Sequence, residues 1–347
     1  MKTKAAVLIG QNKPLEIREL NVPNLNPGQV LVKVAYSGIC QNQLNEFKGV
    51  KGHDPFIPHT MGHEASGIVL NVGEGVTKVK PGDHVVLSWI KGKGIDVPCT
   101  KYNFNGEIVN SGAISTFMEK TVISENRVVP IPKEMPLKEA AILGCAIPTG
   151  AGVILNEMKL EKGNSIAVFG IGGVGLSSLI AAKMLDADPI IAVDVHENKL
   201  ELAKHFGATH LIHAKNEDPI EKIKEITSGK GVDFSFESAG RKEVMETAFQ
   251  SVKMFGGLCV IAGNVNKGDM LHINPYDLIQ GKRIIGTWGG ASKIDQDIAQ
   301  YVKWFMDGKL KLDRLVTHEI RLEEINDLFK ELESGNVGRG MIAFPNQ

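Results

Sequence analysis

A glycine-rich turn between a short apolar strand and a helix restricts the possible folds of this chain more than any other segment. The strand is predicted over Ser165–Phe169, and the turn Gly170-Ile-Gly172-Gly-Val-Gly175 leads directly into a helical pattern. This is the context that the dinucleotide-binding pattern G-x-G-x-x-G requires. Gly170 would make the tight turn, Gly172 would let the backbone approach a pyrophosphate, and Gly175 would let helix and strand pack closely. The phosphates would lie at the helix N-terminus, next to Gly173, where free N–H groups and the helix dipole favour an anion.

An acidic residue follows this turn at the distance expected for a ribose ligand. Asp194 ends the next predicted strand, 19 residues after Gly175. A carboxylate there accepts hydrogen bonds from the adenosine ribose hydroxyls and repels a 2′-phosphate, which favours NAD over NADP. The residues just after it include no Arg that would hold a 2′-phosphate, and Lys199 is placed to bond the ribose. The alternative, a glycine turn that only connects a strand to a helix, does not explain why strand, helix, glycines and acid occur together.

The pattern of apolar residues changes along the chain. Up to about Thr121, short Val and Ile runs are separated by Pro-Gly and Gly-Glu-Gly turn signals, which predicts a closed or partly closed β domain. From about Asn164, strand-like and helical segments alternate, which predicts βαβ units on a parallel sheet of roughly six strands. We therefore expect an α/β protein with a β-rich domain over residues 1–146, completed by residues 288–347, and a doubly wound nucleotide-binding domain over residues 147–287.

The composition argues against several classes of partner. The 347 residues include 39 Lys and Arg and 40 Asp and Glu, which gives a formal charge of −1. A balance this close to zero argues against a nucleic-acid or anionic-membrane partner. No stretch approaches the roughly 18 consecutive apolar residues of a membrane span, and the N-terminal segment lacks a signal-peptide cleavage pattern. The four cysteines are far apart in sequence, unlike a secreted disulfide framework, so we expect a cytoplasmic protein.

Three residues of the chain are candidate metal ligands. They are Cys40 in GICQNQ, His63 in Gly-His-Glu, and Cys145 in LGCAIPTGAG. Two thiolates and one imidazole suit Zn²⁺, and three protein ligands leave the fourth tetrahedral position open for water or substrate. Their spacing matches no local zinc-finger pattern, so each residue taken alone is explained equally well as an ordinary buried side chain.

Seven segments are distinctive when they are taken in order: GICxxxxN, GHExSG, KPGDHV, GCxxPTGAG, GIGGVGLS, VDFSFExxGR and SGNxGR. In these segments and in their order the chain resembles the zinc-dependent medium-chain alcohol and polyol dehydrogenases. The resemblance implies a GroES-like catalytic domain and a Rossmann domain, with Cys40, His63 and Cys145 as catalytic zinc ligands and Glu64 as a carboxylate beside the metal. It also implies these cofactor contacts: Thr149 and Val174 at the nicotinamide, Asp194 and Lys199 at the adenosine ribose, and Arg339 at the pyrophosphate.

The chain departs from the family pattern in two places. The segment that usually carries four closely spaced cysteines for a second zinc has only Cys99, so we expect one zinc per subunit and no structural zinc. The position two after the first zinc ligand, usually a Ser or Thr that relays the substrate proton, is Asn42, and the position five after it, often a His, is Asn45. An amide can hold a substrate oxygen but cannot relay its proton. Gln43 replaces the acid that usually follows, which leaves the ordinary support of the ligands open.

Another group must then take the proton. The possibilities are zinc-bound water, the cofactor ribose, or one of the titrating residues Glu46, His53 and His59. Of these titrating residues, His59 lies nearest in sequence to His63 and is named as the candidate proton carrier, while the other routes stay open. Asn42 and Glu64 complete the predicted catalytic residues.

These features together predict reversible oxidation of an alcohol to a carbonyl compound with hydride transfer to NAD. Asn42, Asn45 and Trp89 are available to bond further hydroxyl groups, which favours a polyol, a sugar derivative or another secondary alcohol as the substrate. Three alternatives stay open: a biosynthetic carbonyl reductase, a non-catalytic NAD-binding relative, and a zinc-free quinone or enoyl reductase. We expect a homo-oligomer that pairs along the last strand of the nucleotide-binding domain, Arg283–Trp288.

Overall fold

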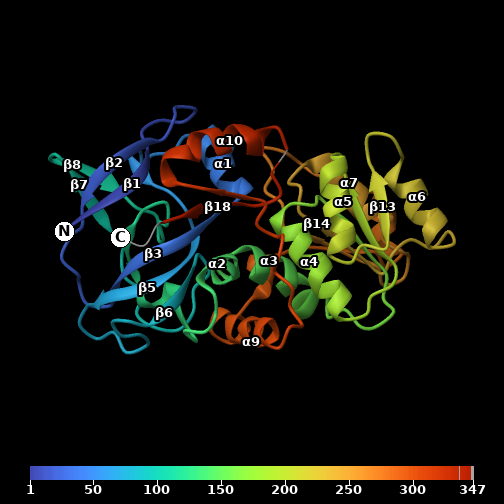
Figure 1. The fold of residues 1–347 in the computed structure, drawn as a ribbon. Coiled ribbons are helices and arrows are strands. Elements are labelled where there is room, and N and C mark those ends of the chain that lie inside the picture. The colour runs from blue at the N-terminus through green and yellow to red at the C-terminus, as the bar shows by residue number, and fades with distance from the viewer. Residues whose placement is uncertain (336, 345–347) are drawn as a thin grey trace. The chain divides into compact units, whose positions relative to one another are not determined.

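The computed structural model describes residues 1–335 and 337–344, and the chain divides into two compact units. Unit 1 combines residues 1–145 with residues 293–347, and unit 2 is formed by residues 146–292. In Figure 1, unit 1 contains both the blue and the red segments, so it is built from both ends of the chain.

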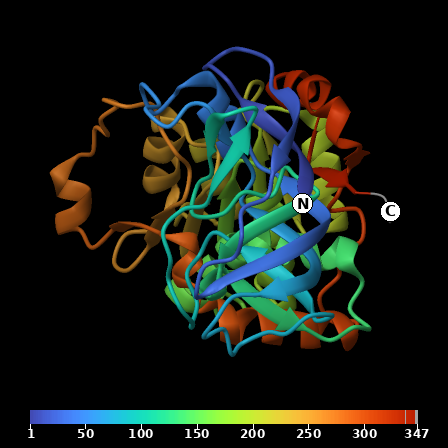
Figure 2. The same ribbon diagram turned by 90° about the vertical axis from the view of Figure 1, so that its left-hand side faces the viewer.

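Unit 1 contains a closed barrel. Its strands, in order around the barrel, are β1 (Lys2–Leu8), β2 (Glu16–Asn21), β7 (Lys101–Phe104), β8 (Glu107–Asn110) and β4 (His59–Thr60). Ala5 and Val7 of β1 point inward and join a buried cluster with Leu20 and Tyr102. Figure 2 shows these N-terminal strands from the front.

A second, larger sheet in unit 1 positions the candidate metal ligands. Its strands, in order, are β10 (Val128–Ile131), β6 (His84–Ser88), β5 (Glu64–Val72), β3 (Gln29–Ile39), β18 (Gly340–Ala343) and β17 (His318–Ile320), and β9 (Lys120–Ser124) also pairs with β3. Ser37 of β3 lies opposite Ala65 of β5, and Ile39 lies opposite Gly340 of β18. These pairings bring three residues that flank the strand ends to the same end of the sheet: Cys40, His63 and Arg339.

Helices cover the strands of unit 1. They are α1 (Gln41–Lys48), α2 (Leu137–Ala141), α9 (Ile294–Met306) and α10 (Ile325–Glu333), with short 3-10 turns at Glu125–Arg127, Ile142–Gly144 and Leu322–Glu324. Phe47 of α1 packs edge-on against Phe329 of α10, with 5.5 Å between ring centroids, and the two helices lie side by side in Figure 1. The C-terminal segment therefore completes the N-terminal domain.

Unit 2 contains a parallel six-stranded sheet. The order of its strands is β13 (His210–His213), β12 (Ile190–Asp194), β11 (Ile166–Phe169), β14 (Phe234–Glu237), β15 (Leu258–Ile261) and β16 (Arg283–Gly286). Numbered within the unit, this is the order 3-2-1-4-5-6 of the doubly wound dinucleotide-binding fold. This topology and the barrel of unit 1 confirm the predicted α/β fold class.

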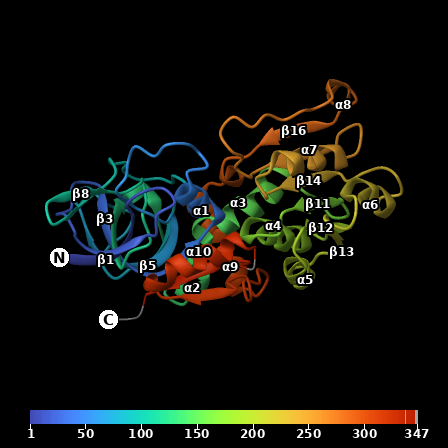
Figure 3. The ribbon, with the colours of Figure 1, turned by 90° about the horizontal axis from the view of Figure 1, so that it is seen from above.

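The helices of unit 2 connect these parallel strands. They are α3 (Ala146–Gly152), α4 (Gly173–Met184), α5 (Glu197–His205), α6 (Pro219–Ile226), α7 (Lys242–Ser251) and α8 (Pro275–Ile279), and a π-helical turn spans Val153–Met158. Seen from above in Figure 3, β16 and α8 lie at the outer margin of unit 2. β16 is an edge strand of the sheet, Ile285 on it is exposed, and no residue of α8 is buried.

Among the described residues, no single helix is long and apolar enough to cross a membrane. The consecutive helical segments Leu137–Gly144 and Ala146–Met158 reach that length and composition only when they are counted together.

Candidate active site

The three predicted zinc ligands lie together in unit 1. Cys40 is the N-cap of α1, His63 precedes β5, and Cys145 follows the 3-10 turn Ile142–Gly144. Their ligand atoms all lie within 4.8 Å of one another, and Nε2 of His63 is 3.2 Å from Sγ of Cys145. Residues from three distant parts of the sequence thus form one cluster.

The chemistry and spacing of this cluster fit a zinc ion. Bonds of about 2.3 Å to sulfur and about 2.0 Å to nitrogen place the ligand atoms of a tetrahedral zinc roughly 3.5–4 Å apart. The hydrogen bond with Cys145 lowers the pKa of Cys40 well below its usual value, although burial acts in the opposite direction. A lowered pKa favours the thiolate, which is the form that binds a metal. Cys40, His63 and Cys145 would hold the ion and leave one coordination position open.

Gln43 supports two of these ligands. It is buried on α1, its Oε1 accepts a hydrogen bond of 2.7 Å from the backbone N–H of Cys40, and its Nε2 lies 2.5 Å from Nδ1 of His63. A residue in contact with the other ring nitrogen fixes the orientation of a metal-binding imidazole. A neutral amide therefore occupies the place where the family usually has an acid.

Glu64 lies beside the cluster and forms a buried ion pair with Arg339. The carboxylate has space only because position 38 is a glycine, since a Cβ there would collide with it. Arg339 also interacts with Cys40, while burial lowers the pKa of its guanidinium. The structure thus places Arg339 at the metal cluster, a contact that the sequence did not indicate. Its role at a cofactor pyrophosphate stays a prediction.

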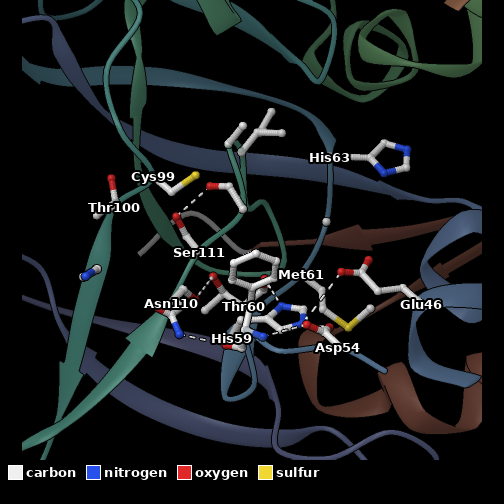
Figure 4. Close-up of a pocket in the computed structure, with 16 residues that line it drawn as sticks. Glu46, Asp54, His59, Thr60, Met61, His63, Cys99, Thr100, Asn110 and Ser111 are labelled. Carbon is white, nitrogen blue, oxygen red and sulfur yellow. Dashed lines mark hydrogen bonds and ion pairs between the residues drawn. The ribbon is translucent and has the colours of Figure 1, made fainter. Parts of the chain in front are cut away.

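A cavity of about 460 Å³ lies within unit 1 next to His63 (Figure 4). Its lining comes from α1, from β4 and the segments on either side of it, and from the segments around β7 and after β8. The lining residues are Glu46, Asp54, Phe56, His59, Thr60, Met61, Gly62, His63, Cys99, Thr100, Lys101, Asn110, Ser111, Gly112, Ala113 and Ile114. Figure 4 shows Glu46, Asp54 and His59 close together, with Cys99 and Thr100 on the opposite side. The cavity therefore has an acidic end and an end that carries hydroxyl and thiol groups.

His59, the predicted proton carrier, is buried at the acidic end. Its Nδ1 lies 2.9 Å from the carbonyl oxygen of Thr60, and its Nε2 lies 2.8 Å from Oδ2 of Asp54 and 3.7 Å from Oε1 of Glu46. Both ring nitrogens of His59 therefore face hydrogen-bond acceptors, and the Nε2 side connects the imidazole to Asp54. The part played by Asp54 could not be predicted, since it stands in no motif.

The amides that were considered for substrate binding lie elsewhere. Asn42 accepts a hydrogen bond of 2.9 Å from Nζ of Lys51, and Asn45 accepts one of 3.3 Å from Nε2 of Gln41. Neither Asn42 nor Asn45 lines the cavity. Trp89 packs edge-on against His63, with 6.5 Å between ring centroids. The polar side chains that line the cavity at this end are instead Glu46, Asp54 and His59.

In unit 2, the glycine-rich turn lies between β11 and α4. Gly172 is the N-cap of α4 and Gly173 is its first residue, so free backbone N–H groups lie at the turn. A Cβ at Gly175 would collide with the carbonyl oxygen of Gly170, which explains the need for glycine where helix and strand meet. The arrangement is that of a phosphate-binding turn.

A second cavity, of about 450 Å³, opens at the carboxyl end of this sheet. Its lining residues are Phe169, Gly170, Val193, Asp194, Val195, Ala214, Lys215, Pro219, Ala239, Arg241, Glu243, Val244 and Thr247. The Asp194 carboxylate accepts hydrogen bonds of 2.7–3.0 Å from the backbone N–H groups of Ile171, Val195 and His196. These bonds fix the carboxylate at the end of β12, and its contact with a ribose stays a prediction.

Two basic residues at this cavity were not predicted. Arg241 stands in the VDFSFExxGR segment, which gave a usable signal, whereas Lys215 stands in no motif. Lys199, the predicted ribose ligand, is not among the residues that line the cavity. Its contact with the cofactor stays a prediction.

The two predicted nicotinamide contacts lie on helices that pack together. Thr149 is on α3 and Val174 is on α4, and a Cβ at Gly150 would collide with the carbonyl oxygen of Val174. Oγ1 of Thr149 is buried and forms no hydrogen bond within the described part of the chain. It is therefore available to a ligand, although its contact with a nicotinamide stays a prediction.

Glu237 is a further buried carboxylate in unit 2. It ends β14, and its Oε1 accepts hydrogen bonds of 2.8 Å and 2.7 Å from the backbone N–H groups of Ala239 and Gly240. Burial raises its pKa to about 7, although these hydrogen bonds act in the opposite direction.

Hydrogen bonds fix the segment before Cys99, where the sequence predicts no structural zinc. Glu125 accepts bonds of 2.7–2.8 Å from the backbone N–H groups of Thr77, Lys78 and Ile95, and Asp295 accepts one of 2.7 Å from the N–H of Lys93. Among the described residues, Glu46, Asp54 and His59 form a second group that could hold a metal ion. Cys99 is exposed at the cavity and belongs neither to this group nor to the cluster of predicted zinc ligands.

Comparison with known proteins agrees with this architecture. Residues 26–133 match the family described as alcohol dehydrogenase GroES-like domain, and residues 173–307 match the zinc-binding dehydrogenase family. An S-(hydroxymethyl)glutathione dehydrogenase of Synechocystis sp. is 35% identical over 372 residues, covering 99% of this chain and 100% of that protein.

Comparison with solved structures indicates the same family. Benzyl alcohol dehydrogenase of Acinetobacter calcoaceticus is 31% identical and superposes with a TM-score of 0.90, covering 99% of this chain and 100% of that one. The 2R,3R-butanediol dehydrogenase of Bacillus subtilis is 29% identical, with a TM-score of 0.79 and the same coverage. The chain therefore belongs to the zinc-dependent alcohol dehydrogenases of the medium-chain dehydrogenase/reductase family, and it is an oxidoreductase of that kind.

Proposed function

We propose that this chain catalyses the reversible oxidation of a primary or secondary alcohol to a carbonyl compound, with NAD as the hydride acceptor and one zinc ion per subunit. The observation that carries the proposal is the cluster of Cys40, His63 and Cys145. When bound there, zinc supplies Lewis acidity that favours the alkoxide form of the alcohol, and the nicotinamide accepts the hydride.

The side chains of unit 1 hold and orient the reacting groups. Cys40, His63 and Cys145 bind the ion, and Gln43 keeps Cys40 and His63 in place through its amide. Glu64, whose charge is balanced by Arg339, adds a negative group beside the cluster. Trp89 packs edge-on against the His63 ring and so helps to orient it.

His59 is the proposed proton carrier, acting together with Asp54. Because Nε2 of His59 and Oδ2 of Asp54 are 2.8 Å apart, a proton between them is available to an alkoxide when the reaction runs toward the alcohol. In the opposite direction the same pair takes up the proton that the alcohol releases. Asn42, by contrast, keeps only a role in positioning, since its amide cannot titrate.

The preference for NAD follows from Asp194. Its carboxylate accepts the ribose hydroxyls of NAD and repels the 2′-phosphate of NADP. Thr149 and Val174 would contact the nicotinamide, and Lys199 and Arg241 would lie near the adenosine. Because the thiolates of Cys40 and Cys145 must stay reduced to bind zinc, the proposal also places the protein in a reducing compartment such as the cytoplasm.

The proposal includes a homodimer that pairs along β16. An edge strand with exposed apolar side chains is a template for pairing with a second chain, and Ile285 and Trp288 are both exposed here. Two copies related by a two-fold axis would then form a continuous sheet.

The first experiment combines the zinc content of the purified protein with NAD reduction on a panel of alcohols. We expect about one zinc per subunit, and loss of both zinc and activity in Cys40→Ser. Cys99→Ser is the matched control, because Cys99 belongs to neither ligand cluster. Stoichiometric zinc that Cys40→Ser retains would contradict the metal assignment, whereas bound zinc and NAD without turnover would favour a non-catalytic relative.

The direction of the reaction needs a separate measurement. Rates of carbonyl reduction with NADH, set against rates of alcohol oxidation at the same pH, distinguish a biosynthetic reductase from an oxidising dehydrogenase. Reduction of quinones or enones by a zinc-free protein would contradict the proposal.

A further inference from the structure

The cavity beside His63 has room for more than a small alcohol. Its volume of about 460 Å³ lies within the range of sites that bind drug-sized ligands. Phe56, Met61 and Ile114 supply apolar surface to its lining. A substrate that fills it would therefore reach beyond the reacting hydroxyl to the polar groups at the acidic end.

Glu46 is the group at the acidic end that is open to such a substrate. Both oxygens of Asp54 are occupied, since Oδ1 accepts a hydrogen bond of 2.9 Å from the N–H of Phe56 and Oδ2 faces His59. The Glu46 side chain is 39% exposed, and its closest charged contact among the described residues is Nε2 of His59 at 3.7 Å. That distance is too long for a hydrogen bond.

Charged groups of both signs lie around Glu46, but none of those described donates a hydrogen bond to its carboxylate. The positive groups near it are His59, His63 and Lys51, and Asp54 is the nearby negative group. Nε2 of His59 faces Oδ2 of Asp54, and Nζ of Lys51 donates a hydrogen bond to Asn42, so neither of these groups donates to Glu46. Lys101 also lines the cavity, next in sequence to Thr100, which Figure 4 shows on the side opposite Glu46.

We propose that Glu46 binds an ammonium group of the substrate, so that the alcohol this enzyme oxidises is an amino alcohol. The inference rests on the proposed function, and it assigns the substrate class and a specificity residue. A half-exposed carboxylate in a cavity favours a cation, which it can hold with a charge-assisted hydrogen bond. An anionic substituent at the same place would be repelled.

The test uses four linear substrates of matched length: aminopentanol, pentanediol, hexanol and hydroxypentanoate. We expect kcat/KM for aminopentanol to exceed that for hexanol by about tenfold or more, which is the range of a hydrogen bond to a charged group. In Glu46→Gln this ratio should fall by about tenfold. Glu134→Gln is the matched control, because Glu134 is exposed, lies outside the cavity and should leave the ratio unchanged.

Three outcomes would overturn the inference. The first is an aminopentanol to hexanol ratio that Glu46→Gln does not change, and the second is equal use of pentanediol and aminopentanol by the unaltered protein. The third is a preference for hydroxypentanoate, which would instead indicate recognition at Lys101. Failure of the proposed function would look different, because hexanol would then not be oxidised either.

A binding measurement that needs no turnover tests the role of Glu46 separately from the proposed oxidation of alcohols. Cys99 is exposed at the cavity, so its rate of alkylation by iodoacetamide, followed on the peptide by mass spectrometry, reports whether the cavity is occupied. Pentylamine should slow alkylation of the zinc-loaded protein and have much less effect on Glu46→Gln. Equal protection of both proteins, or protection of neither, would contradict the role of Glu46.

Discussion

Glu64 and Arg339 form a buried ion pair next to a metal-binding thiol, so the loss of either charge has a large cost. Arg339→Met would leave the Glu64 carboxylate buried without its cation, and we expect a loss of about 3–5 kcal/mol in the free energy of unfolding. Urea denaturation of the zinc-free protein measures this loss. Arg321→Met, at an exposed position, is the control, and Glu64→Gln combined with Arg339→Met should recover much of the loss. A change below about 0.5 kcal/mol for Arg339→Met would contradict the argument.

Glu237 links the stability of unit 2 to pH. Its pKa is raised from about 4.5 to about 7 on folding, so between these values the folded state binds a proton that the unfolded state does not. The corresponding stabilisation is present at low pH and is lost as the pH rises through about 7. A shift of this size corresponds to something on the order of 3 kcal/mol.

Glu237→Gln should therefore flatten the dependence of stability on pH. The measurement is the urea midpoint at pH 5 and pH 8, with Glu221→Gln on the exposed surface of α6 as the control. If the variant and the unaltered protein lose the same stability between these pH values, Glu237 is not the group responsible.

At the scale of single residues, the sequence predicts site residues that stand in motifs. It does not predict site residues that only folding brings to the site. Cys40, His63 and Cys145 could be grouped because each stands in a recognisable segment. Asp54 and Lys215 stand in none, and their places at the two cavities depend on loops whose course no local pattern specifies. The contact between Arg339 and Glu64 likewise depends on the pairing of β18 with β3.

Among the elements, the end of β12 determines which cofactor fits. Replacing Asp194 with Ser removes the charge that repels a 2′-phosphate, so we expect the ratio of kcat/KM for NADP to that for NAD to rise about tenfold or more. Steady-state kinetics with the two cofactors give this ratio. Glu201→Ser, on the following helix α5, removes a charge of the same sign and should leave the ratio unchanged. A parallel loss with both cofactors would indicate damage to the turn instead.

The elements that the sequence predicts best are those with a strong pattern of their own. β11, α4 and β12 carry continuous apolar runs and the glycine turn. β13 has the sequence His-Leu-Ile-His and is half exposed, so it has no pattern that distinguishes it from a loop. β4 has only two residues, and it is a strand only because β1 and β8 pair with it.

For the molecule as a whole, the proposed dimer makes a direct prediction. A charge on the edge strand opposes pairing with a second copy, so Ile285→Lys should convert a dimer into a monomer without unfolding it. Light scattering after size-exclusion chromatography measures the mass, and circular dichroism checks the fold. Leu70→Lys, at an exposed position on β5, is the control. A dimer that survives Ile285→Lys would place the interface elsewhere.

The division of the chain into two units also determines the order in which the units can fold during synthesis. Unit 2 is one continuous segment and can close as soon as residue 292 has left the ribosome, whereas unit 1 has to wait for residues 293–347. Glu64 is made early and Arg339 is made last, so the buried ion pair between them can form only when translation is nearly finished. The nucleotide-binding half can therefore reach its native form first, and a stable metal site marks a chain whose translation has passed residue 339.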